Sequence, residues 1–342
     1  MLPTLLGILF FTFLIIQFVP GGPVEQLVNK LSGLDSITES SSSSNTYRGS
    51  NGLSDEHIEQ LNKFYGFDKP FLERFLIMIG NYASFDLGMS YFHNQSVGEL
   101  ILSKLPVSIS LGLWSFIIVY LVSIPLGIKK AINDGSRFDI ISSTIVLIGY
   151  SIPGFVLGIG LIVLLGGGSF FDIFPTRGLV SDDWSNLSVI EKILDYLWHI
   201  TLPIICLIIG SFAVMTMLTK NSFIDEINKL YTVTARAKGL SENKVLYSHV
   251  FKNAIIPILT GFPAQFVSAF FTGSILIETI FSLDGIGLLS YEAIIQRDYP
   301  VVMGTLFVFT LIGLLTKLIT DIMYVYVDPR IKFTSSSTQR NQ

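Results

Sequence analysis

Six long apolar stretches dominate the pattern of hydrophobic and polar positions along this chain. The hydrocarbon core of a bilayer is about 30 Å thick, and a helix crosses it with roughly 20 consecutive apolar residues. Stretches of about that length lie at residues 2–19, 106–128, 140–165, 200–219, 254–277 and 301–327. The pattern therefore predicts an all-α integral membrane protein with six transmembrane helices.

The composition indicates a protein whose solvent is largely lipid. Half of the 342 residues are hydrophobic and 14% are charged, and the mean hydropathy is +0.60. A water-soluble domain needs a polar shell that such a composition cannot supply. The first stretch, residues 2–19, lacks the basic leader and the A-x-A cleavage site of a secretory signal, so we expect it to be retained as a helix.

Lys and Arg in the loops predict the orientation of the spans, because cytoplasmic loops carry an excess of these residues. Here they gather in alternate loops and in the tail, at residues 129–139, 220–253 and 328–342. The intervening segments are longer and hold more Asp and Glu than Lys and Arg. We therefore expect both termini to lie in the cytoplasm.

The spans divide the chain into four predicted parts. These are transmembrane helix 1 at residues 1–19, a long exoplasmic segment at 20–104, a core with helices 2 to 6 at 105–327, and a cytoplasmic tail at 328–342. Within the exoplasmic segment, the polar, Ser-rich run at 38–52 predicts a flexible linker. Residues 54–66 and 71–85 predict short amphipathic helices, which either dock an extracytoplasmic partner or cover the bundle and bind nothing.

The basic loop between the fourth and fifth spans is the most distinctive polar segment. Its residues 231–239 read YTVTARAKG, in which small residues alternate with cations: Ala235, Arg236, Ala237, Lys238 and Gly239. A short helix with so little bulk can seat closely in a groove of another protein, while its cations fix the register against acidic groups. The alternative is an ordinary basic connecting loop.

This loop resembles the cytoplasmic loop of binding-protein-dependent ABC importer permeases, specifically the oligopeptide and dipeptide branch. There the segment reads close to YVRTARAKGL and continues to H-x-x-R-N-A-x-x-P. The continuation here is His249, Lys252, Asn253, Ala254 and Pro257. Other segments that look like this branch lie at residues 20–23, 86–90, 105–108, 278–282, 285–287, 297–300 and 327–330. The resemblance covers essentially the whole chain.

The resemblance is finer in some places and departs in others. One sub-branch of B-type permeases is most similar at residues 47–49, 65–70, 168–172, 177–181 and 195–199. The Glu-Ala-Ala that begins the loop in the wider superfamily is replaced by Val233, Thr234 and Ala235. Relatives also place a short leader before the first span, whereas this chain begins directly with Met1-Leu2-Pro3.

The resemblance implies a type I importer fold in a bacterial inner membrane. In that arrangement two permeases enclose a path, an extracytoplasmic binding protein delivers the cargo, and a cytoplasmic ABC ATPase drives transport. ATP and Mg²⁺ belong to the ATPase, so no cofactor is expected in this chain, which also lacks the phosphate loop G-x-x-x-x-G-K-S/T. The residues matched to the ATPase contact are Thr234, Ala235, Arg236, Ala237, Lys238 and Gly239.

The implied cargo is oligopeptides or peptide-like antibiotics of the microcin C type. Related importers for dipeptides or nickel are the alternative. The partners expected are thus a second, homologous permease, an ABC ATPase, a binding protein and membrane lipid, with no nucleic acid.

A polar stripe marks a candidate translocation path in the fifth span. Gly261, Gln265, Ser268 and Thr272 recur at i, i+4, i+7 and i+11, which places them within about 60° on a helix. Such a stripe lines a cavity or packs on another helix, and both readings stand. Glu278 follows at the outer side, where it either gates the mouth of the path or is an interfacial carboxylate near water.

Catalysis by this chain has little support. The four His residues are scattered at positions 57, 93, 199 and 249, without an H-E-x-x-H motif, and Cys206 is alone. We therefore predict no metal site, no disulfide and no enzymatic activity within the chain. A self-sufficient secondary transporter would show charged residues at midplane and inverted repeats, and the sequence shows neither.

Overall fold

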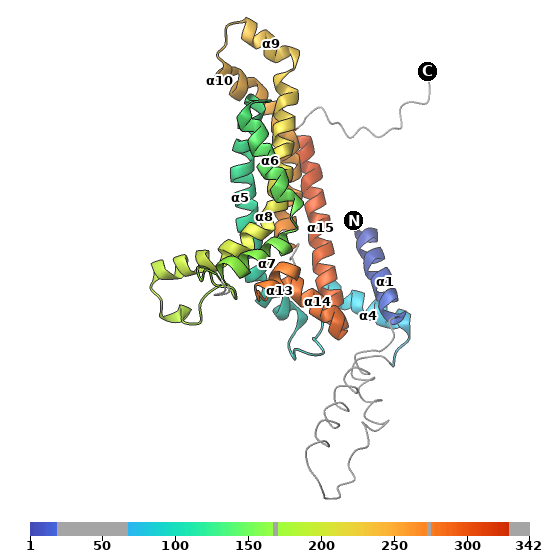
Figure 1. Cartoon of the computed structure of the whole chain (residues 1–342). Helices are drawn as coiled ribbons and strands as arrows, with labels where there is room; N and C mark the ends of the chain where they lie inside the picture. Colours follow the sequence, from blue (N-terminus) through green and yellow to red (C-terminus); the bar gives the residue numbers. More distant parts are fainter. Residues whose placement is uncertain (19–67, 167–169, 272–274, 328–342) are drawn as a thin grey trace, which may run out of the picture. The chain divides into compact units, whose positions relative to one another are not determined.

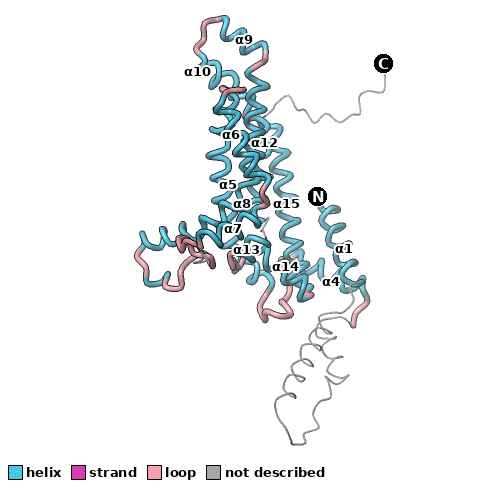
Figure 2. Tube along the Cα trace, viewed as in Figure 1, coloured by secondary structure: helices cyan, strands magenta, loops and turns pink. Residues whose placement is uncertain are grey.

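The computed structural model describes residues 1–18, 68–166, 170–271 and 275–327. Over these residues the chain is helical, with no strand and one isolated bridge between Met89 and Ser96 (Figure 2). The predicted all-α class is confirmed for this part of the chain. The predicted Ser-rich linker, the helix at 54–66 and the tail at 328–342 lie outside the described residues.

Three of the described helices are long and apolar enough to cross a membrane: α5 (Val97–Ile132), α8 (Val189–Ile227) and α15 (Tyr299–Val327). The apolar helices α1 (Leu2–Phe18) and α14 (Ile286–Gln296) are shorter. Two bent pairs of helices also qualify if each pair counts as one span, which gives up to five within the described ranges. The prediction of six transmembrane helices is therefore not confirmed.

The predicted third span is not one straight helix. Residues 140–165 belong to α6 (Arg137–Ser151) and α7 (Gly154–Leu165), which meet at an angle of 93°. Between them Ile152 is extended, with φ −93° and ψ 119°. The next residue, Pro153, disfavours the helical conformation at the residue before it and has no N–H to continue the helix. Hydropathy alone measures the length of an apolar run and not its direction, so it misses this corner.

The predicted fifth span is interrupted as well. Helical residues 242–254 and 256–267 meet at 49°, and the chain here forms α11 (Phe251–Ala254) and α12 (Ile256–Phe271). Pro257 lies in the first turn of α12, where its missing N–H would be unsatisfied in any case. A separate short helix, α13 (Ile275–Ile280), carries the end of the predicted span.

The described residues fall into two compact units, residues 1–104 with 289–311 and residues 105–288 with 312–342. In the first unit α1 packs on α4 (Phe71–Ala83) through aromatic rings, with Phe10 and Phe75 centroids 5.3 Å apart. The predicted helix at 71–85 is thus confirmed in position. Two of its apolar residues, Leu72 and Leu76, are exposed.

The second unit holds the basic loop and most of the apolar core. In it α5, α6 and α8 run alongside one another, and the loop helices α9 (Leu230–Ala237) and α10 (Glu242–Val245) lie at one end (Figure 1). A cluster that includes Leu111, Cys206 and Phe281 is buried among these helices.

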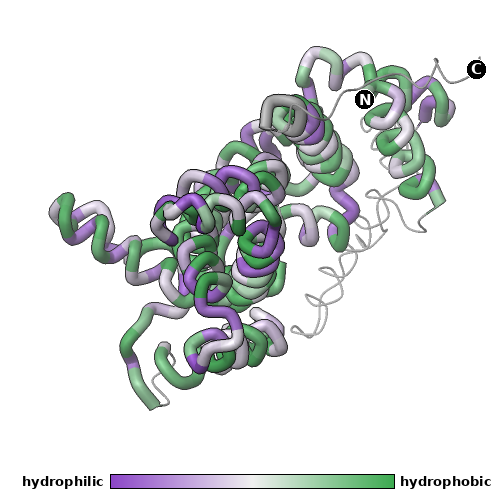
Figure 3. The backbone as a smooth tube through the Cα atoms, turned by 90° about the horizontal axis from the view of Figure 1, so that it is seen from above, coloured by the Kyte–Doolittle hydropathy of each residue, from purple (hydrophilic) through white to green (hydrophobic). Residues whose placement is uncertain are grey.

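Many large apolar side chains of the second unit point outward instead of inward. Leu121, Ile141 and Ile145 are all exposed, and hydrophobic positions run along most of the helices (Figure 3). A water-soluble protein rarely presents so much contiguous apolar surface. Exposure to lipid explains it, because lipid chains are as apolar as these side chains.

Gly154 permits the closest approach between α7 and α8. A Cβ atom at Gly154 would lie 2.4 Å from the carbonyl oxygen of Cys206, which is backbone and cannot rotate away. We expect Gly154→Ala to destabilise the protein by about 1–3 kcal/mol, the usual cost of overpacking, as measured by reversible unfolding in detergent micelles. Gly160→Ala is the matched control in the same helix, since nothing lies within 4 Å of a Cβ there. Equal effects at both positions would contradict the close approach.

Candidate functional site: a loop helix and a buried cavity

The basic loop forms a short helix within the segment that the sequence singles out. α9 spans Leu230–Ala237, and Gly239 follows with φ +82°. A glycine adopts this left-handed conformation without a steric cost, which is why it commonly ends helices. The N–H of Gly239 donates to the carbonyl of Arg236 at 2.9 Å. The predicted helix is thus a defined structural element.

Polar contacts fasten α9 to the end of α8 and to α11. The buried Thr232 hydroxyl donates to the carbonyl of Ile227 at 2.7 Å. The Tyr231 hydroxyl donates to the carboxylate of Glu226 and accepts a hydrogen bond of 3.1 Å from the Asn253 amide. Burial, and then the bond to Glu226, raise the pKa of Tyr231, so it remains a protonated donor. These bonds hold α9 against two neighbouring helices.

The candidate contact residues of the loop divide between two faces of α9. Ala235 is buried against Phe223 and Val250 of its own chain. Arg236 is partly exposed and pairs with Glu242, its Nε atom lying 2.9 Å from Oε1. The remaining four are exposed, namely Thr234, Ala237, Lys238 and Gly239.

The outward face of α9 contains two residues that sequence reasoning missed. Leu230 is 84% exposed and Val233 is 52% exposed. Together with Ala237 they stand at i, i+3 and i+7, which is one face of a helix. The helical spacing of these three residues is visible in the sequence. The predicted contact is based instead on the small residues and cations of the loop.

A buried cluster of charges lies where α5, α6 and α8 meet near the loop. Lys130 is fully buried, and its Nζ atom lies 3.1 Å from Asp139 Oδ1 and 2.8 Å from Ser142 Oγ. Lys220 reaches the same carboxylate, with Nζ 2.7 Å from Oδ2, and also lies 2.9 Å from Asp134 Oδ1. Sequence reasoning missed this cluster and assigned both lysines to orientation alone.

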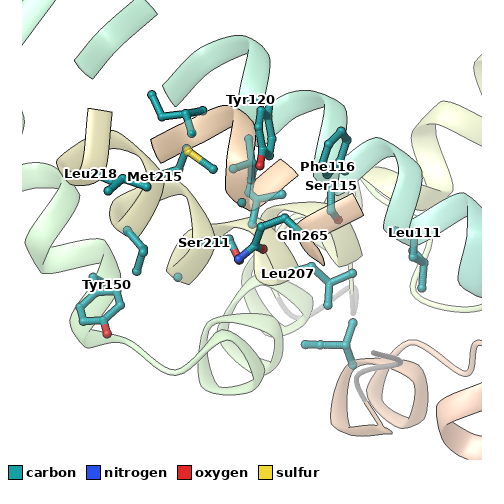
Figure 4. A pocket seen from close by; sticks show the side chains of 18 of the residues that line it. Leu111, Ser115, Phe116, Tyr120, Tyr150, Leu207, Ser211, Met215, Leu218 and Gln265 are labelled. Carbon is teal, nitrogen blue, oxygen red and sulfur yellow. The ribbon is translucent and has the colours of Figure 1, made fainter. Parts of the chain in front are cut away.

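The polar stripe of the fifth span opens onto a cavity of about 580 Å³ within the second unit. Gly261, Gln265 and Glu278 line it, and in Figure 4 the amide of Gln265 points towards its middle. Thr272 and the side chain of Ser268 lie outside the described residues. Other polar lining residues come from α5, α6 and α8: Ser108, Ser115, Tyr120, Tyr150 and Ser211.

Glu278 is buried, with 1% of its surface exposed. Its Oε2 atom accepts a hydrogen bond of 2.7 Å from the N–H of Leu288, and its carboxylate packs so closely on Gly285 that a Cβ there would lie 2.6 Å from Cδ. The carboxylate thus sits at the start of α14, where unpaired N–H groups favour a negative charge. The expectation of an interfacial carboxylate near water is wrong, because the turn after α13 folds back over it.

Comparisons with known proteins agree on one family. The profile of the binding-protein-dependent transport system inner membrane component matches residues 123–333. The chain is 57% identical to the peptidoglycan transport system permease protein YejB of Agrobacterium fabrum, over 97% of this chain and 96% of the relative. It is 53% identical to the inner membrane ABC transporter permease protein YejB of Escherichia coli O157:H7, with the same coverage.

A more distant sequence relative and one solved structure are also similar to this chain. The oligopeptide transport system permease protein AppB of Bacillus subtilis is 33% identical, over 97% of this chain and 96% of the relative. Among solved structures, a chain of the inward-facing MetNI methionine ABC transporter matches with a TM-score of 0.50 and 15% identity. That match covers 67% of this chain and 96% of the other, and it supports the fold alone.

Proposed function

The chain belongs to the binding-protein-dependent transport system inner membrane component family and is a permease subunit of an ABC importer, and we propose that this importer carries oligopeptides or peptide-like antibiotics of the microcin C type. The observation that carries the proposal is similarity along 97% of the chain to YejB permeases, at 57% and 53% identity. Permeases named for oligopeptide and dipeptide transport follow at 33% and 32%.

The outward face of α9 is the contact for a cytoplasmic ABC ATPase, which binds the ATP and Mg²⁺. Leu230, Val233 and Ala237 are apolar and exposed, and a face of this kind buries well in a groove. Lys238 lies exposed beside them and meets acidic groups at the rim. Ala235 supports the helix from within.

Movement of the ATPase reaches the path through the fixed ends of α8 and α11. Thr232 and Tyr231 tie α9 to these helices, and Lys220 ties the end of α8 to α6. The cavity lined by Gln265 and Glu278 is this chain's share of the translocation path. A second permease supplies the other share, and rigid-body rearrangement of the two alternates access.

The orientation of the chain follows from the side that the ATPase occupies. With α9 in the cytoplasm and six crossings of the membrane, both termini are cytoplasmic, and the segment at 20–104 lies outside, where the binding protein docks. The basic residues of the loop at 220–253 support this orientation.

Peptidoglycan fragments are a second candidate cargo. The 57% identical relative from Agrobacterium fabrum is named a peptidoglycan transport system permease. Such fragments carry peptides, so the two candidates share chemistry. A competition assay between a peptidoglycan-derived peptide and an unrelated oligopeptide would distinguish these two candidates. The preferred cargo is the one that inhibits uptake of its competitor at the lower inhibitor concentration.

Reconstitution tests the proposed function. We expect vesicles that contain this chain, a second permease and the ABC ATPase to accumulate a labelled oligopeptide when binding protein and ATP are added. Vesicles with this chain alone should accumulate none, because no phosphate loop is present in its sequence. Accumulation by the chain alone, or uptake of Ni²⁺ with no uptake of peptide, would contradict the proposal.

A further inference from the structure

The cavity of the second unit has an unusual charge character. Among the side chains that line it, Glu278 is the one with a formal charge, and the others are apolar or neutral and polar. An anionic ligand would therefore meet a like charge and no cation in this lining. A cationic ligand would meet its counter-charge.

Three polar atoms of the lining are buried without a hydrogen-bond partner among the described residues: Ser115 Oγ, Tyr120 Oη and Glu278 Oε1. A buried polar atom without a partner costs free energy, and a charged one costs more. At the start of α14 the N–H of Leu288 donates to Oε2 of Glu278, and the N–H of Gly287 also stabilises this carboxylate. Oε1 has no hydrogen-bond partner among the described residues.

We propose that the cavity binds the N-terminal ammonium group of a peptide, with Glu278 as its counter-charge. An ammonium group has three donors and no acceptor, so it can satisfy Oε1 without disturbing the bond of Oε2 to Leu288. Hydrogen bonds between an ammonium and a carboxylate are among the strongest in proteins. This inference rests on the proposed function, and it specifies which group of the substrate this chain recognises.

The dimensions of the cavity suit a short extended peptide. Its lining runs along α5 from Ser108, which accepts a hydrogen bond from the N–H of Ile286 at the start of α14, to Tyr120. This is a distance of about 18 Å at the rise of an α-helix. An extended chain covers this distance with about five residues. Ser115, Gln265 and Ser211 lie along the way and offer hydrogen bonds to peptide groups (Figure 4).

The same lining has no group that would recognise the C-terminus of the peptide. A free C-terminal carboxylate finds no cation among the residues of the cavity. Blocking the C-terminus should therefore matter little, whereas acetylation of the N-terminus removes the charge that Glu278 recognises.

Direct binding to the assembled transporter, without binding protein, tests this assignment. The probes are trialanine, N-acetyl-trialanine and trialanine amide, measured by equilibrium binding to the complex of this chain, the second permease and the ATPase in nanodiscs. We expect trialanine and its amide to bind alike, and N-acetyl-trialanine to bind at least about tenfold more weakly, as expected for loss of one charge-assisted hydrogen bond. In the Glu278→Gln variant, all three peptides should bind with the weak affinity that N-acetyl-trialanine has for the wild type.

Two variants separate recognition from folding. Glu278→Gln keeps an oxygen that accepts from the N–H of Leu288, so its thermal midpoint should match that of the wild type. In Gln265→Met the new side chain is similar in size but cannot hydrogen-bond through an amide. This variant should lower the affinity for all three peptides equally and keep the preference for a free N-terminus.

The assignment is overturned if none of the peptides binds, if acetylation has no effect on the wild type, or if Glu278→Gln preserves the discrimination. Each of these results can occur while the wild-type transporter still imports peptide with binding protein and ATP. Failure of that import would instead contradict the proposed function.

Discussion

Replacing Ala237 by Trp is expected to abolish ATP-driven uptake while the protein remains folded in the membrane. Ala237 is exposed at the last position of α9, so an indole there points away from the chain's own core. In the proposed contact, the indole occupies the space that the ATPase groove fills beside Leu230 and Val233. The measurements are peptide uptake by reconstituted vesicles, the amount of protein in the membrane and the thermal midpoint.

The control for this substitution is Ile145→Trp, at an exposed position of α6 on the apolar outer surface that faces lipid. It introduces the same side chain away from α9 and should leave uptake unchanged. Ala235→Trp is a poor probe of the partner contact, because Ala235 is buried against Phe223 and Val250 and the variant should lose stability. Full uptake by Ala237→Trp would remove α9 from the coupling contact.

The sequence predicts most of the helices but not their continuity. The apolar runs that became α5, α8 and α15 are long and uninterrupted, so length alone identifies them. The run at 140–165 is equally apolar but contains Pro153, and the corner that follows is set by local backbone chemistry. Counting every proline as a helix boundary would have found this corner, but it would also have divided α5 at Pro125 and α8 at Pro203, where the helices continue.

The loop helix shows which part of a site depends on tertiary structure. Its bounds follow from local signals, above all from Gly239 at the left-handed position. The face on which Ala235 lies depends on what packs against the helix, and a small residue suits a partner's groove and its own core equally well. Likewise, the turn that buries Glu278 brings in Leu288 from the next helix, which no spacing rule reveals.

The buried charge cluster could not have been found from the sequence. Lys130 and Asp139 belong to one short loop, and their charges there indicate orientation. The second partner, Lys220, comes from the far end of α8. Only the packing of α5, α6 and α8 shows that three helix ends meet at one carboxylate.

Asp139→Ala is expected to lower the free energy of unfolding by about 3–5 kcal/mol, because it leaves a buried cation without its counter-charge. Lys130 is fully buried and keeps only the neutral hydroxyls of Ser142 and Ser143 and a backbone carbonyl as partners. Water cannot replace the lost carboxylate at that depth. Reversible unfolding of the purified protein in mixed detergent micelles measures the change.

Asp134→Ala provides the comparison, since it removes a different carboxylate from the same network. The Asp134 side chain is 55% exposed and pairs only with Lys220 among the interactions of the described residues, so the expected loss is about 0–1 kcal/mol. Lys130→Met with Asp139→Ala should recover part of the stability lost by Asp139→Ala alone, because the unpaired buried charge is then gone. If the double variant is less stable than Asp139→Ala, the penalty comes from lost packing at the three helix ends and not from a stranded charge.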